Sequence, residues 1–204
     1  MTQRFEPLAA HEWGDEEYAT FGVLLGLPAD EVPRAGSGER YDPLKFPVMG
    51  MLAHHTKLAK PFLRFNNQQL FGGTLPDRLR ELAILRVAHA HESPFEWGEH
   101  VRIGTEAGIT PDEVEALGRG NEGFGGHDLL VLEATDELLT NHRMGDTWDR
   151  LLAALGKHPA IELIFVVGTY ATLSMAFETW GLPPSPGALP LPPPRPTTPE
   201  GNRP

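Results

Sequence analysis

The 204-residue chain contains no cysteine. Without cysteine there is no disulfide, no zinc–thiolate or iron–sulfur site and no thiol nucleophile, so thiol peroxidase chemistry is excluded. Positive charge is also scarce, because 17 lysines and arginines stand against 28 aspartates and glutamates, for a formal net charge of −11. A chain this acidic lacks the electrostatic attraction that binding to nucleic acid or to an anionic membrane surface requires.

Long apolar runs are missing too. No stretch approaches the roughly 18 uninterrupted apolar residues of a membrane span, and the first residues lack the apolar run of a secretion signal. We therefore expect a soluble, cytoplasmic protein with no membrane partner. The length fits one domain with a short appendage, and a hydrophobic content of 40% is enough to form a core.

Proline is distributed unevenly. Ten of the 20 prolines fall in residues 182–204, which contain no aromatic residue. Such a segment cannot bury enough apolar surface to offset the entropy of ordering it, so we predict a disordered Pro-rich tail there. Residues 1–46 are predicted to be irregular, with one helix from Gly14 to Gly26. Residues 47–181 are predicted to form a helical domain.

Within that domain, apolar residues recur at helical spacing and strand-like alternation is absent. The pattern predicts an all-α fold. The expected helices lie near residues 48–59, 61–71, 76–91, 94–107, 111–119, 127–142, 147–156 and 159–180. Three of the helix starts match a capping box, in which a hydroxyl residue is followed three places later by an acid. The three pairs are Thr74 with Asp77, Ser93 with Glu96, and Thr110 with Glu113.

The first candidate for chemistry is Glu81. It stands in a segment that is apolar almost all round, and such a helix is buried. A buried carboxyl group must be paired, hydrogen-bonded or protonated, because an unpaired buried charge is costly. Two interpretations stay open at this point. One is an internal ion pair with Arg86 or another arginine, and the other is a catalytic carboxyl group.

The second candidate is the pair Glu96 and His100, which stand one helical turn apart on the next helix. A carboxylate beside an imidazole holds its tautomer, and an imidazole suits a general acid or base near neutral pH. A structural interpretation is also open, since Glu96 occupies the acid position of a capping box and a histidine can be a satisfied core residue.

These residues carry a family resemblance. The segments Leu79–Ala88 and Ser93–Val101 resemble the carboxymuconolactone decarboxylase family, which shares an all-α helical-bundle fold with the alkyl hydroperoxidase D-like peroxidases. The peroxidase signature is Glu, eleven residues, Cys, two residues, Cys, three residues, His. The frame here reads Glu81, Ser93, Glu96 and His100, so both cysteines are replaced. The resemblance covers roughly residues 48–181 and points to a cysteine-free branch.

What the resemblance implies is a cofactor-independent lyase that acts on a small lactone or a related carboxylated or polyketide-like ring. In the family's named reaction, a γ-lactone carrying a carboxylate loses carbon dioxide, and the resulting carbanion is reprotonated on carbon. The resemblance further implies a homo-oligomer whose partner is a small-molecule substrate. No metal and no cofactor are expected.

The same resemblance assigns roles to particular side chains. His100 is the expected acid or base, Glu96 is expected to orient it, and Glu81 is expected to be a second carboxyl group or proton relay. The candidate substrate-binding residues are Trp97, Arg86 and Phe65.

Three other interpretations remain open. In the first interpretation, the protein is a related enzyme that catalyses an isomerisation or a dehydration rather than a decarboxylation. Alternatively, the chain is a non-catalytic small-molecule-binding or assembly protein, in which Glu81, Glu96 and His100 form a buried network that sets the helix register. The third interpretation gathers these same three side chains around a metal ion.

Overall fold

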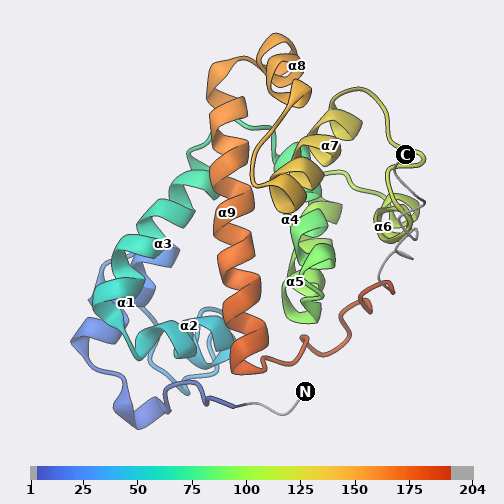
Figure 1. Ribbon diagram of the computed structural model, residues 1–204. Coiled ribbons are helices and arrows are strands. Elements are labelled where there is room, and N and C mark those ends of the chain that lie inside the picture. The colour runs from blue at the N-terminus through green and yellow to red at the C-terminus, as the bar shows by residue number, and fades with distance from the viewer. Residues whose placement is uncertain (1–3, 194–204) are drawn as a thin grey trace. The chain divides into compact units, whose positions relative to one another are not determined.

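The computed structural model describes residues 4–193, and every regular element in that range is a helix (Figure 1). The predicted all-α fold is therefore confirmed. The α-helices are α1 (Asp15–Leu25), α2 (Pro47–Ala53), α3 (Thr56–Phe71), α4 (Asp77–Ala90), α5 (Pro94–Glu106), α6 (Pro111–Arg119), α7 (Gly126–Asn141), α8 (Asp146–Leu155) and α9 (Lys157–Trp180). Three short 3-10 helices precede α2.

The helix boundaries agree with the sequence pattern except near α2 and α3. The sequence predicts a break just before Pro61, but the structure breaks at His54 and His55 and keeps Pro61 inside α3. His55 leaves the helical region with φ −141° and ψ 68°, so the chain turns there. Pro61 removes only the hydrogen bond to the carbonyl of Lys57, close to the helix start, and α3 continues through it.

The chain divides into two compact units, Met1–Gly73 with Phe177–Pro183, and Thr74–Ala176 with Pro184–Pro204. The first unit has its own core, in which α1 packs against α2 and α3. Its buried members are Leu8, Trp13, Tyr18, Phe21, Val32, Met49, Ala53 and Leu63. The sequence places the boundaries of the helical domain after residues 46 and 181, and these boundaries stay predictions. The second unit contains Glu81, Glu96 and His100.

In the second unit, α4 is the central helix. It packs against α5, α6 and α7, and its residues from Leu79 to His89 are all buried. Arg78, at the start of α4, donates to Glu113 of α6 at 2.6 Å and to Asp128 of α7 at 2.8 Å. Because the stretch from Leu79 to His89 has no solvated face, any polar side chain in it must find a partner inside the protein.

Only one of the three predicted capping boxes forms. At α6, the Thr110 hydroxyl accepts from the Glu113 backbone N–H, and the Glu113 carboxylate accepts from the Thr110 N–H. At α4, the Thr74 N–H and hydroxyl donate instead to Glu162 of α9, at 2.7 and 3.0 Å. The capping prediction for Thr74 is wrong, because a carboxylate from a distant helix satisfies these donors.

The helix α9 corrects a further expectation. By length and composition, its 24 residues are apolar enough to cross a membrane, whereas the sequence pattern had suggested no such segment. Half of its most apolar window is buried, and the core helix of a soluble protein passes the same test. Length and composition alone therefore do not separate a core helix from a membrane span.

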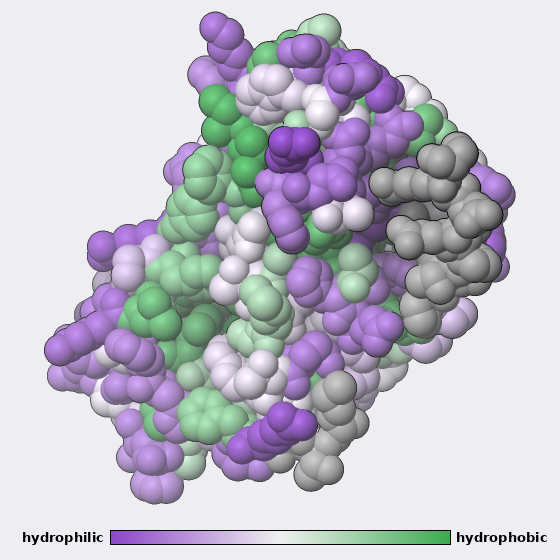
Figure 2. All heavy atoms as spheres, viewed as in Figure 1, coloured by the Kyte–Doolittle hydropathy of each residue, from purple (hydrophilic) through white to green (hydrophobic). Residues whose placement is uncertain are grey.

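The same helix bears on the predicted homo-oligomer. Ile161, Ile164 and Phe165 are 40–52% exposed, and Figure 2 shows hydrophobic residues over the upper part of α9. Since exposed apolar surface favours association, we expect a closed homo-oligomer at micromolar concentration. Light scattering of the purified full-length chain measures this. A monomer over the whole concentration range would refute the prediction.

The described part of the predicted Pro-rich tail, up to residue 193, runs as extended chain along α5 and α6. A Cβ on Gly98 of α5 would come within 2.7 Å of the Ala188 side chain, and a Cβ on Gly118 of α6 within 2.3 Å of Pro192. Both glycines therefore provide room for this segment. Residues 194–204 lie outside the described part of the chain.

We expect this segment to contribute little to stability. Deleting residues 184–204 removes two side-chain hydrogen bonds of the described residues, one from Ser185 to Glu99 and one between Nε2 of His89 and the Pro193 carbonyl, but keeps the buried Leu182. The expected loss is about 2 kcal/mol of unfolding free energy or less, because each such hydrogen bond contributes about 1 kcal/mol. Urea denaturation of the truncated and full-length chains measures the difference. A loss above about 4 kcal/mol would show that the segment is part of the core.

Candidate functional site

The candidate site is built around a hydrogen bond between α4 and α5. Glu81 is fully buried, and its Oε2 lies 2.7 Å from Nδ1 of His100. A carboxylate can only accept, so Nδ1 carries the hydrogen and donates it. Glu81 and His100, which the family frame groups together, are therefore in direct contact.

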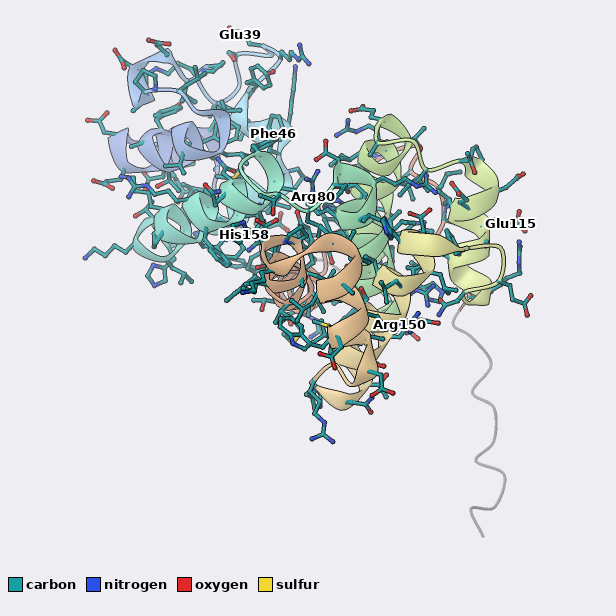
Figure 3. The ribbon with its side chains drawn as sticks, turned by 90° about the horizontal axis from the view of Figure 1, so that it is seen from above. Glu39, Phe46, Arg80, Glu115, Arg150 and His158 are labelled. Carbon is teal, nitrogen blue, oxygen red and sulfur yellow. The ribbon has the colours of Figure 1, made fainter. Side chains whose placement is uncertain are left out.

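The second oxygen of Glu81 is also engaged. Oε1 accepts from Nε of Arg80 at 3.1 Å, and Nη1 of Arg80 donates to Asp77 at 2.7 Å. The Asp77 side chain is 74% exposed, so this chain of contacts runs from the solvent to the buried imidazole. In Figure 3, Arg80 lies among crowded side chains, whereas Glu115 projects outward from α6.

A glycine lets the two helices approach at this level. Gly104 stands one turn after His100 on α5, and a Cβ there would lie 3.0 Å from Ile109, 3.5 Å from Leu85 and 3.6 Å from the Cβ of Glu81. An alanine at this position would require Ile109 to shift by a small distance, whereas its contacts with Leu85 and Glu81 would be ordinary van der Waals contacts. The backbone of α5 thus lies close enough to α4 for the short reach between Glu81 and His100.

The second ring nitrogen of His100, Nε2, is not used by the described part of the fold. No hydrogen bond joins Nε2 of His100 to any residue in the range that the structure describes, and the side chain is 10% exposed. A histidine held by a carboxylate at Nδ1 presents Nε2 in a defined direction. Nε2 is therefore the ring nitrogen that is left for a contact with a molecule other than the described protein residues.

Glu96 has a different partner from the one that the sequence suggested. Its Oε2 accepts from the Ser174 hydroxyl of α9. Ser93 is the N-cap residue of α5 but makes no side-chain capping bond, so the capping box predicted for Ser93 and Glu96 is wrong. The carboxylate that is hydrogen-bonded to His100 is that of Glu81, and the orienting role expected of Glu96 stays a prediction.

Arg86 corrects another expectation. Its Nη1 donates to Asp136 of α7 at 3.0 Å, and its Nη2 donates to the Gly120 carbonyl and to Asn121, both at 2.9 Å. Glu81 does belong to an internal ion pair, as one of its two open interpretations has it, but the arginine is Arg80 and not Arg86. Arg86 holds α4 to α7 and to the loop before it, and its role in binding a substrate carboxylate remains only a prediction.

The two aromatic candidates lie in different units. Trp97 is fully buried on α5 with its ring centroid 6.1 Å from that of His89, and its indole N–H has no hydrogen-bond partner in the described residues. Phe65 stands on α3 of the first unit and is 44% exposed. Their predicted contact with a substrate is not tested by these positions.

The three candidate metal ligands do not come together. Glu81 and His100 form a pair, whereas Glu96 is bonded to Ser174. Within residues 4–193, no group of three or more histidine, aspartate or glutamate side chains is placed to hold a metal ion. The interpretation of Glu81, Glu96 and His100 as one ligand set is therefore wrong.

Sequence reasoning missed two neighbours on α9, Tyr170 and Ser174. The Tyr170 ring stands edge-on to the His100 imidazole, with centroids 4.9 Å apart and an interplanar angle of 88°. One signal was present in the sequence, because Tyr170 and Ser174 repeat the four-residue spacing of Glu96 and His100. That spacing places two polar groups on one face of an apolar helix.

Part of the chain matches a known protein family. The model of the carboxymuconolactone decarboxylase family matches residues 56–132, from the start of α3 into α7. The family resemblance is confirmed. No curated protein and no solved structure matches the chain.

The carboxymuconolactone decarboxylase segment includes Glu81, Glu96 and His100 but ends before α8 and α9. The two α9 residues that face the site, Tyr170 and Ser174, therefore lie outside the matched residues. The family match covers the two helices that carry Glu81 and His100, and the structure adds the contacts of α9 with them.

Proposed function

We propose that this protein is a cofactor-independent carboxy-lyase that acts on a small carboxylated lactone or a related ring. The observation that carries the proposal is the bond between Glu81 and His100, which leaves Nε2 of the imidazole without a protein partner. The match to the carboxymuconolactone decarboxylase family supports the reaction class.

In the proposed reaction, the bond between the lactone ring carbon and the substrate carboxylate breaks, and carbon dioxide leaves. The electron pair of that bond passes through the neighbouring C=C bond into the lactone carbonyl and forms a dienolate. The doubly protonated His100 then donates its Nε2 proton to a carbon of the dienolate, and the imidazole regains a proton from solvent. Each turnover consumes one proton and releases one carbon dioxide.

Glu81 supports this step in two ways. Its Oε2 fixes the imidazole so that Nε2 faces the substrate, and its negative charge stabilises the imidazolium that donates the proton. Arg80 holds the other oxygen, so the carboxylate keeps one position throughout. Glu81 is thus the positioning residue of the proposal, and His100 is its catalytic acid.

The test has two arms. The first compares depletion of metabolites from a small-molecule extract by the wild-type protein and by His100→Ala, with no class of substrate assumed. The second measures carbon dioxide release from 4-carboxymuconolactone. Depletion by the wild type but not by the variant, with carbon dioxide as a product, supports the proposal.

Other outcomes would overturn it. Consumption of a substrate without carbon dioxide release would indicate an isomerase or a dehydratase. A tight complex that is never turned over would indicate a binding protein in which Glu81 and His100 only set the helix register.

A further inference from the structure

Tyr170 is the one aromatic residue of α9 whose ring meets the catalytic imidazole. Its position follows from helix register. On α5, Glu96 and His100 are one turn apart, and on α9 their neighbours Ser174 and Tyr170 are also one turn apart. The order is reversed, so the two helices run antiparallel here, and the Ser174 contact fixes the level at which Tyr170 meets His100.

The hydroxyl group of Tyr170 is not used by the fold. No hydrogen bond joins it to any residue between 4 and 193, although only 2% of the residue's surface is exposed. Tyr18, the other buried tyrosine, shows the contrast, because its hydroxyl accepts from the Ala35 backbone N–H at 3.1 Å. A buried phenol without a protein partner has a hydrogen to offer to a bound molecule.

The surroundings keep that hydrogen in place. Burial raises the pKa of Tyr170 well above the ordinary value for tyrosine, and the charges of Glu81 and then Glu96 raise it further, against a smaller opposing effect of Arg80. A negative phenolate beside two carboxylates is strongly disfavoured. Tyr170 is therefore a neutral donor throughout the neutral pH range.

We propose that the Tyr170 hydroxyl is the hydrogen-bond donor that stabilises the dienolate oxygen formed in the reaction proposed above. This inference rests on that proposed function and adds the group that the reaction needs at oxygen. The Tyr170 and His100 rings are in edge-to-face contact, with centroids 4.9 Å apart, so a substrate bound at the imidazole would lie near the phenol.

The chemistry divides two tasks between two groups. His100 must give its proton to carbon, so it cannot also serve as the permanent donor to the carbonyl oxygen. A neutral phenol suits the second task, because its hydrogen bond strengthens as negative charge develops on that oxygen and the proton remains on the tyrosine. Such donors are effective in sites from which water is excluded.

The experiment compares Tyr170→Phe with Tyr18→Phe in the full chain. Tyr170→Phe removes one oxygen atom that bonds to no described residue, so melting should stay close to wild type. We expect kcat for carbon dioxide release to fall by about 10²- to 10³-fold, as for other oxyanion donors. KM should change by less than about threefold, since the donor acts mainly in the transition state. Tyr18→Phe should keep wild-type kinetics.

Two further measurements do not depend on turnover. The anion of tetronic acid is a planar five-membered lactone enolate, and we expect Tyr170→Phe to bind it about tenfold more weakly than wild type, a loss on the order of one hydrogen bond. In an alkaline titration followed by phenolate absorbance, wild type and Tyr170→Phe should coincide below the pH of unfolding, because Tyr170 stays neutral while the protein is folded.

The outcomes separate the two proposals. Equal kcat in wild type and Tyr170→Phe, with His100→Ala inactive, would overturn the role of Tyr170 and leave the lyase proposal standing. Loss of a phenolate step near pH 10 in Tyr170→Phe, or equal tetronate binding, would also count against Tyr170. No carbon dioxide release by wild type would overturn the proposed function itself.

Discussion

Replacing His100 with glutamine is expected to lower kcat/KM for the decarboxylated substrate by about 10²- to 10⁴-fold, the usual contribution of a positioned general acid. Glutamine keeps a donor for the Glu81 carboxylate but has no proton that it can transfer at neutral pH. Steady-state carbon dioxide release at several substrate concentrations measures the effect. Thermal melting should stay near the wild-type value, because the buried carboxylate keeps a hydrogen bond.

The matched control is His127→Gln. His127 stands on α7 in the same unit and is exposed, so the substitution should change neither kinetics nor melting. Wild-type turnover in His100→Gln would end the acid–base role of the imidazole, whichever substrate is used.

Replacing Glu81 with glutamine is expected to have the largest effect on stability. The neutral amide cannot accept from both Arg80 and His100 as the carboxylate does, so a largely buried guanidinium loses its closest buried counter-charge. Removing one partner of a buried ion pair costs about 3–5 kcal/mol of unfolding free energy. Because Arg80 keeps its contact with Asp77, we expect the lower part of that range.

Urea denaturation measures the loss, and Glu106→Gln is the control. Glu106 pairs with Arg102 at 3.1 Å on the surface of α5, and both side chains are well exposed. Exposed pairs contribute between 0 and 1 kcal/mol, so this variant should be close to wild type. If Glu81→Gln matched Glu106→Gln, the buried contacts of Glu81 would contribute nothing to the fold.

The contact between Glu81 and His100 could be anticipated in part from chain geometry. Helices α4 and α5 are joined by residues 91–93, so positions at equal distance from residue 92 lie at the same level in an antiparallel pair. Glu81 is eleven residues before that point and His100 is eight after it, a difference of three residues, or about 4.5 Å of helix rise. A glutamate side chain spans that distance.

Glu96 fails the same geometric test. It is only four residues after residue 92, so it stands seven residues, or about 10 Å, from the level of Glu81. The sequence frame groups Glu81, Glu96 and His100, but the two helices alone bring only Glu81 to His100. The partner of Glu96 had to come from another helix, and it is Ser174 of α9.

The capping boxes show where local reasoning ends. The pattern is the same at Thr74, Ser93 and Thr110, yet only Thr110 forms the box. At α6 the local bonds form even though Glu113 also pairs with Arg78, because Arg78 binds Oε1 of Glu113 and leaves Oε2 for the Thr110 N–H. At α4, the Thr74 N–H donates to Glu162 instead of to Asp77. At α5, the Glu96 carboxylate accepts from Ser174 instead of bonding to Ser93.

By itself, the sequence determined the helical class, most helix positions, the exclusion of thiol chemistry and the family segment that carries Glu81 and His100. These depend on composition and on spacing within one helix or one hairpin, where neighbours in sequence are neighbours in space. Only the tertiary structure decided which arginine pairs with Glu81, which carboxylate is hydrogen-bonded to the imidazole, and that Tyr170 stands beside it. The Glu81–His100 and His100–Tyr170 contacts join residues 19 and 70 positions apart, so packing in three dimensions decides them, and periodicity within one helix does not predict them.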